Sequence, residues 1–216
     1  MRYLCTTCGT QFADRPEPPV ACPICTDDRQ YVAPTGQAWT THDALATTHR
    51  VRIEEDGDLL GIGITPGFAI PQRALHVHTD IGNVLWDCTS LVTPEAVEAI
   101  GRRGGIDVIA ISHPHFYASM VEWSDALGGI PILVHAADRG WIQRPAPQIV
   151  HWDGDIHRLS PTVCLYRCAG HFPRLDAAAL DGRTPRALGD PRRRHAARHR
   201  RPTPRHVHVL RAQLRA

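Results

Sequence analysis

Apolar residues recur along the middle of the chain in short runs that glycine, proline and aspartate interrupt. This pattern predicts strands at residues 75–77, 83–86, 108–111, 132–135 and 163–167, the first two joined by a turn at 79–82. A helix is predicted to open at Thr93-Pro94-Glu95, where threonine caps and proline fits the first turn, and another covers residues 117–127. Strands that alternate with helices predict an α/β fold.

Three histidines follow two of these strands. His113 and His115 come directly after the apolar run 106–111, and His171 comes after the strand predicted at 163–167. A lone histidine near a strand end is more often a hydrogen-bonded core or surface residue than a ligand. Two imidazoles at i and i+2 can nevertheless point into one cleft. A third from a distant strand end completes a facial three-nitrogen set that leaves one coordination position open for water, which predicts a catalytic metal site.

Two Cys-x-x-Cys pairs lie at the amino terminus, Cys5 with Cys8 and Cys22 with Cys25. Such spacing brings four thiolates to a tetrahedral metal, and a stretch this short needs the metal to fold. Zinc is the predicted ion, with iron as the alternative. The pattern resembles the zinc-ribbon and rubredoxin-like knuckle family. Two disulfides in a secreted domain are the competing interpretation.

The beginning of the chain has no apolar segment of signal-peptide length, and no stretch approaches the roughly 18 apolar residues of a membrane helix. The sequence therefore predicts a cytoplasmic protein with reduced cysteines and no membrane partner. The remaining cysteines, Cys88, Cys164 and Cys168, are then expected to be buried free thiols, although the last two lie near the third histidine and could contact a metal.

Around the histidines the chain resembles the metallo-β-lactamase-fold hydrolases, whose first metal motif reads His-x-His-x-Asp-His and whose next motif is Gly-His before a Gly-Ser turn. His113 and His115 match the first two ligand positions, and His171 matches the third. Tyr117 and Ala118 stand where the family has aspartate and histidine, so the ligands of a second metal are missing. Arg174 and Leu175 replace the Gly-Ser turn.

The resemblance implies an αββα sandwich whose second half is incomplete. On the basis of this resemblance, we expect the chain to divide into a zinc ribbon at 1–33, a partial metallo-β-lactamase-like domain at 34–173 and an irregular Arg/Pro-rich tail at 174–216. By analogy the function is hydrolysis of a small-molecule ester, thioester or lactone. A zinc held by His113, His115 and His171 would activate water as hydroxide for attack on the carbonyl carbon and stabilise the oxyanion. The acyl and leaving groups are not identified.

Three further residues near this cleft have two interpretations each. Tyr117 either donates a hydrogen bond to the oxyanion or packs on the following helix, and packing is favoured. Asp87 either orients a ligating imidazole or is a turn residue at a strand end. His135 is expected to have a structural or supporting role and not to bind the first metal.

The charge is unevenly distributed. All 24 basic residues are arginine, and the net charge is +2. From residue 174 onward, twelve arginines against three aspartates give +9, so the rest of the chain carries −7. A nucleic-acid arm is disfavoured because no aromatic platform accompanies the arginines. The Arg/Pro/Ala/His bias is instead typical of a GC-rich gene translated in the wrong frame, and we expect a frame shift near residue 174.

Two other functions remain open. The ribbon could be a non-catalytic module that binds a protein or nucleic acid, or the chain could be an inactive, truncated hydrolase. The sequence leaves the oligomeric state undetermined.

Overall fold

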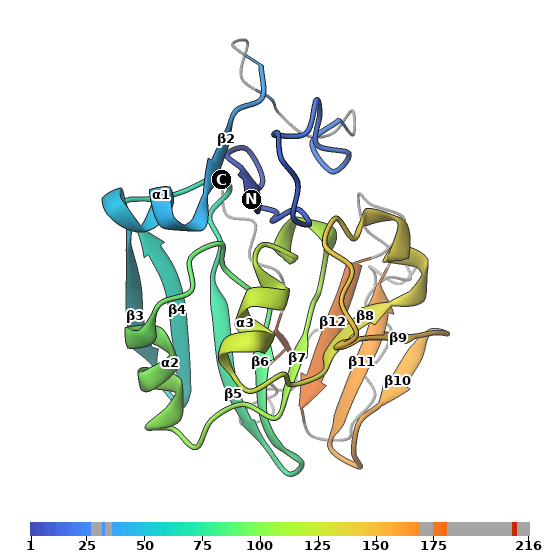
Figure 1. Cartoon of the computed structure of the whole chain (residues 1–216). Coiled ribbons are helices and arrows are strands. Elements are labelled where there is room, and N and C mark those ends of the chain that lie inside the picture. Colours follow the sequence, from blue (N-terminus) through green and yellow to red (C-terminus); the bar gives the residue numbers. More distant parts are fainter. Residues whose placement is uncertain (27–31, 33–35, 169–174, 181–208, 211–216) are drawn as a thin grey trace, which may run out of the picture.

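A mixed seven-stranded sheet forms the centre of the molecule (Figure 1). The structure is a computed structural model and describes residues 1–26, 32, 36–168, 175–180 and 209–210. The strands lie in sequence order: β3 (Arg50–Asp56), β4 (Leu59–Thr65), β5 (Ala74–Thr79), β6 (Gly82–Trp86), β7 (Val108–Ala110), β8 (Ile132–His135) and β9 (Ile149–Trp152). Strands β3 to β6 are antiparallel, whereas β6 to β9 are parallel.

The carboxyl ends of the parallel strands meet at one edge of this sheet, as they do in other parallel sheets. Asp87 follows β6, the histidines at 113 and 115 follow β7, and His135 ends β8. The topology therefore brings the predicted cleft residues of three separate segments to one edge.

The described residues also form two smaller sheets. One is antiparallel, with the order β10 (Ile156–Arg158), β11 (Val163–Cys168), β12 (Leu175–Leu180) and β13 (Val209–Leu210). The other pairs β1 (Tyr3–Cys5) with β2 (Trp39–Thr41) at the amino terminus. The sequence analysis predicted an irregular chain from residue 174. The structure differs there, because the backbone of β12 pairs with β11 at six positions.

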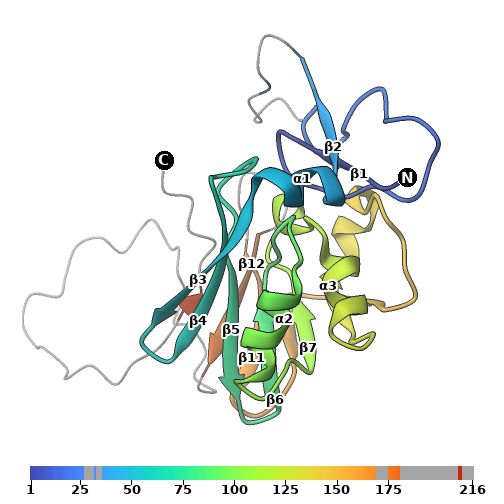
Figure 2. The ribbon, with the colours of Figure 1, turned by 60° about the vertical axis from the view of Figure 1, so that its left-hand side comes forward.

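In the described part of the chain, three α-helices and two 3-10 helices connect the strands: α1 (His42–Thr48), α2 (Pro94–Gly101), η1 (Pro114–Phe116), α3 (Met120–Ala126) and η2 (Ala136–Trp141). Thr93 caps α2 as predicted, since its Oγ1 accepts a hydrogen bond from the Ala96 amide at 3.3 Å. Figure 2 shows α2 and α3 together on one side of the large sheet.

Alternate residues of the parallel strands face two separate hydrophobic clusters. Leu85 and Ile109 point to the side that carries the helices and pack with Ile100 and Trp123. Their neighbours in the chain, such as Trp86 and Ala110, point to the other side, where Leu165 of β11 joins them. A helical layer and a second sheet therefore cover opposite faces of the large sheet, and the predicted α/β class is confirmed.

Most predicted elements of this region occur close to their expected bounds. The hairpin of β5 and β6, helix α2 and strand β8 are present. The helix expected at 117–127 begins only at Met120, because residues 114–116 form a 3-10 turn and Ala118 has a positive φ of 41°. Strands β3 and β4 were not predicted. Among the described residues, no helix is both long and apolar enough to cross a membrane.

Candidate metal centres

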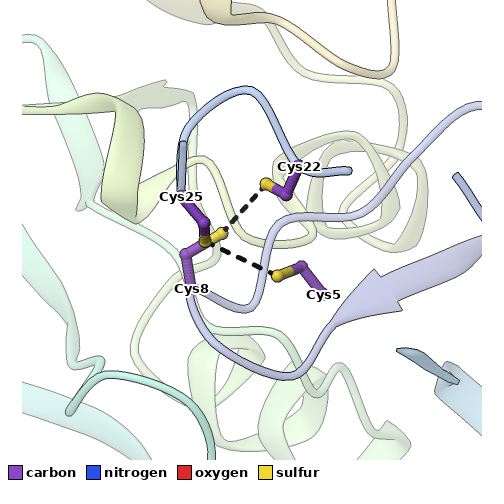
Figure 3. Close-up of side chains that lie close together, drawn as sticks. All are labelled: Cys5, Cys8, Cys22 and Cys25. Atoms are coloured by element: carbon purple, nitrogen blue, oxygen red, sulfur yellow. Dashed lines mark hydrogen bonds between the residues drawn. The ribbon is translucent and has the colours of Figure 1, made fainter. Parts of the chain in front are cut away.

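The four amino-terminal cysteines converge on one point (Figure 3). Their Sγ atoms all lie within 4.8 Å of one another, with 3.6 Å between Cys5 and Cys25 and 3.7 Å between Cys8 and Cys22. A disulfide requires about 2.05 Å, so these thiols are free. A Zn–S distance of about 2.3 Å implies about 3.8 Å between sulfurs of a tetrahedral site. The cluster therefore has the size that a tetrahedral zinc or iron ion requires.

Burial makes this cluster unfavourable without a cation. All four cysteines are at most 2% exposed. Hydrogen bonds from Cys22, Cys25 and Cys8 lower the pKa of Cys5, whereas contacts with Cys22, Cys5 and Cys8 raise the pKa of Cys25. The four groups therefore cannot all ionise together on their own. A bound metal ion would supply the charge that stabilises four thiolates in this place.

The backbone around the cysteines is shaped as two tight turns. In the first, the Gly9 amide donates to the Cys5 carbonyl at 2.8 Å, and Gly9 has a φ of +81°. In the second, the Cys25 amide donates to the Cys22 carbonyl at 3.0 Å. These turns aim the side chains of each pair in one direction, which explains the spacing of two residues between the cysteines.

The histidine turn, defined as residues 113–119, follows β7 directly. His113 and His115 are 3% and 7% exposed, and their ring centroids are 4.9 Å apart. The structure thus brings the two imidazoles side by side, and their role as metal ligands stays a prediction. Nδ1 of His113 accepts a hydrogen bond from the His115 amide at 3.2 Å. A neutral His113 in that arrangement carries its proton on Nε2, so a metal bound at Nε2 requires the other tautomer.

Asp87 fixes the start of this turn. It is 3% exposed and has a φ of +63°. Its Oδ1 accepts from the Ser112 amide at 2.8 Å and its Oδ2 from the Ser112 hydroxyl at 2.9 Å. Burial raises the pKa of Asp87 to about 7, although the bonds from Ser112 oppose that shift. Asp87 therefore holds the residue immediately before His113, and the orienting of a ligating imidazole by Asp87 stays a prediction.

Tyr117 and His135 lie beside the histidine turn, and both bond to backbone. The Tyr117 hydroxyl donates to the Asp138 carbonyl at 3.2 Å, and the side chain is 2% exposed. The hydroxyl thus bonds to η2, and both roles considered for Tyr117 stay predictions. His135 uses both ring nitrogens, Nε2 with the Gly154 carbonyl at 3.0 Å and Nδ1 with the Ala137 amide at 3.1 Å. It therefore has the structural role that the sequence analysis expected.

The third predicted ligand, His171, lies outside the described residues, as does the side chain of Cys168. Cys88 and Cys164 are buried free thiols, as expected. Sequence reasoning missed Gln72 and Ser90, which lie between the cysteine cluster and the histidine turn. Neither residue belongs to a recognisable motif, and their positions depend on contacts between segments far apart in the chain.

Comparison with known proteins found a relative by sequence and several similar solved structures. It is 40% identical over 173 residues to the uncharacterized protein YmaE of Bacillus subtilis (strain 168), an overlap of 79% of this chain and 63% of that protein. The chain therefore spans less than two thirds of the length of this relative. No family model matches the chain.

Similar solved structures include the DIM-1 metallo-β-lactamase, with 15% identity, a TM-score of 0.49 and coverage of 61% of this chain and 65% of that chain. A quorum-quenching N-acyl homoserine lactone hydrolase has 19% identity, a TM-score of 0.40 and coverage of 51% and 56%. Each overlap covers only part of this chain.

Proposed function

We propose that this protein is a metal-dependent hydrolase that acts on the carbonyl group of a small-molecule ester, thioester or lactone. The observation that carries the proposal is the pair of buried imidazoles on the histidine turn. Ser112, the residue before this turn, donates two hydrogen bonds to the Asp87 carboxylate. Buried imidazoles at the carboxyl edge of parallel strands are suited to ligate a metal at the mouth of a cleft. His171 is proposed as the third ligand on the basis of the sequence resemblance.

In this proposal His113 and His115 hold the metal, and a bound zinc supplies a Lewis acid that polarises a carbonyl group and lowers the pKa of water. The residues of the chain orient the site. Asp87 keeps Ser112 and therefore the beginning of the turn in place, and the nearby Phe116 ring packs against His113 with centroids 6.5 Å apart. Tyr117 is proposed as an oxyanion donor only if its bond to the Asp138 carbonyl is exchanged for one to substrate.

The cysteine cluster is proposed as a structural zinc site, because all four coordinating atoms come from the protein and no position is left for substrate. With free thiols in the described part of the chain, we further propose a reducing, cytoplasmic location. The predicted total is one metal in the ribbon and at most one in the histidine cleft.

The test combines elemental analysis with an ester, thioester and lactone panel on zinc-saturated protein. His113→Ala and His115→Ala should each remove the cleft metal and abolish turnover, while the control His49→Ala, a half-buried histidine at the end of α1, should change neither. Three tightly bound metals per chain would contradict the proposed ligand set. Unchanged metal content and unchanged turnover in both cleft variants would remove the hydrolase proposal.

A non-catalytic ribbon module is the second candidate. It is favoured by one observation: among the described residues, the four cysteines form the only group that meets the geometric requirement for a metal site. In that case Cys5→Ala should abolish binding of a protein or nucleic acid while the histidines can be changed freely. A cleft that binds zinc without any turnover would instead indicate an inactive hydrolase.

A further inference from the structure

The cysteine cluster and the histidine turn meet at a buried junction. Gly9, beside Cys8, lies so close to Gln72 and Ser90 that a Cβ at position 9 would fall 2.6 Å from Gln72 Nε2 and 2.2 Å from Ser90 Oγ. Gln72 is 7% exposed and Ser90 is fully buried. The junction thus joins the ribbon to two loops of the large sheet without space between them.

The side-chain amide of Gln72 bonds to three different segments. Its Oε1 accepts from the Ser90 amide at 3.0 Å and lies 2.8 Å from the Ser90 hydroxyl. Its Nε2 donates to the Cys8 carbonyl at 2.9 Å and to the His115 carbonyl at 3.4 Å. An amide NH2 has two hydrogens, so it can serve both carbonyls at once. One side chain therefore connects a predicted ribbon ligand to a predicted cleft ligand.

Further bonds hold the far end of the histidine turn against the same parts of the structure. The Gln11 amide of the ribbon donates to the Ala118 carbonyl at 2.9 Å. The Ser119 hydroxyl donates to the Ser90 carbonyl at 2.8 Å. The turn is consequently fixed by the ribbon on one side and by the loop after β6 on the other, with Gln72 in contact with both.

We propose that Gln72 is a positioning residue that makes the geometry of His115 depend on the metal-loaded ribbon. A bound metal fixes the position of Cys8 and of its carbonyl, and the Gln72 amide passes that constraint to the His115 carbonyl. Loss of the ribbon metal would remove the ion that joins the four Sγ atoms, which lie within 4.8 Å of one another, and so would loosen this knuckle and with it the histidine turn. The effect on cleft metal affinity rests on the proposed function, whereas the effect on the order of the turn does not.

The test compares Gln72→Glu, Gln72→Leu and a control in the full chain at saturating zinc. The ionised Glu side chain can still accept from the Ser90 amide but cannot donate to either carbonyl. Gln37→Leu is the control, because the Gln37 side chain accepts a bond from the Cys22 amide at 2.6 Å in the other knuckle, away from the histidine turn. A cobalt-loaded sample of each variant reports through its thiolate charge-transfer band that the ribbon is intact.

The measurement is hydrogen–deuterium exchange of a peptide that covers residues 113–119, with α2 as the internal reference. Loss of the donated bonds should accelerate exchange in the turn about five- to tenfold in both Gln72 variants. Chelation of the ribbon metal from the unaltered protein should accelerate it at least as much, and Gln37→Leu should leave it within about twofold. Zinc competition should show cleft affinity about tenfold weaker in the Gln72 variants.

Exchange in the turn that is unchanged in Gln72→Glu and Gln72→Leu, with the ribbon band intact, would overturn the inference. If exchange also accelerates in α2 of either variant, that variant has lost global stability and the chelation experiment decides. In that experiment, an acceleration of exchange in the turn that is no larger than the acceleration in α2 would also overturn the inference. If the histidine cleft binds no zinc but exchange in the turn accelerates in the Gln72 variants, the proposed function fails and the positioning role of Gln72 remains.

Discussion

Replacement of Gly9 by alanine should destabilise the protein far more than an ordinary glycine substitution. Gly9 has a φ of +81°, and an alanine in the left-handed region costs about 1 to 2 kcal/mol. The added methyl group would also overlap Ser90 Oγ and Nε2 of Gln72. Displacement of buried neighbours costs about 1 to 3 kcal/mol. We therefore expect Gly9→Ala to lower the free energy of unfolding by about 2 to 5 kcal/mol in total.

Gly129→Ala separates the two contributions. Gly129 has nearly the same φ, +79°, but no atom lies within 4 Å of the position its Cβ would occupy. This control should lose only the conformational part, about 1 to 2 kcal/mol. Urea unfolding at saturating zinc, followed by tryptophan fluorescence, gives both values. A loss in Gly9→Ala within about 0.5 kcal/mol of the control would refute the tight packing of the ribbon against Gln72 and Ser90.

The remaining predictions concern single contacts and the tail. For Asp87, the pKa of about 7 in the folded state lies above the ordinary value of 3.8, so its contribution to stability is full at low pH and is lost as the pH rises through 7. Urea unfolding should therefore show about 2 to 3 kcal/mol less stability at pH 8 than at pH 5 from this group, and Asp87→Asn should remove that difference; an unaltered pH dependence would contradict the buried carboxyl. Cys5→Ser should weaken ribbon zinc more than about 100-fold in chelator competition, and retention of wild-type affinity would exclude Cys5 as a ligand. Trp123→Phe should cost about 2 to 3 kcal/mol on thermal unfolding, because the buried indole donates to the Thr89 carbonyl at 3.0 Å and fills the core; a cost below about 0.5 kcal/mol would show that this bond contributes nothing. Gene sequencing should reveal a one-base shift near residue 174, and a downstream reading frame that offers no continuation of the fold would remove the frame-shift hypothesis.

Local sequence patterns predicted the elements that have a continuous apolar run or a clear capping sequence. Strand β8 is a continuous apolar run and has its predicted bounds. Helix α2 carries its own start in Thr93 and Pro94. Strand β3 was missed because Arg50–Asp56 alternates charged residues with few apolar ones, and its stability comes from pairing with β4 along seven positions. Pairing between segments of this kind is a tertiary effect that periodicity does not encode.

The candidate sites show the same division. The cysteine spacing predicted a cluster that the structure brings together, since two turns of fixed length determine most of its geometry. The neighbouring positions of His113 and His115 followed from their place after a strand. Gln72 could not be predicted, because its three partner segments are 18 to 64 residues away in the chain. The actual bonds of Asp87 to Ser112 also depend on the parallel pairing of β6 and β7.

The hydrophobic interior extends without a break from the ribbon into the body of the protein. Leu4, Phe12 and Ile24 belong to the same buried cluster as Val121 and Trp123 of α3. A shortened chain that began after the ribbon would expose the apolar surface that these three residues now cover. The cysteine segment is therefore not an independent module that recombination could add or remove without exposing apolar surface. A substitution on the ribbon side of this contact has to be accommodated by the residues of α3, and the reverse also holds.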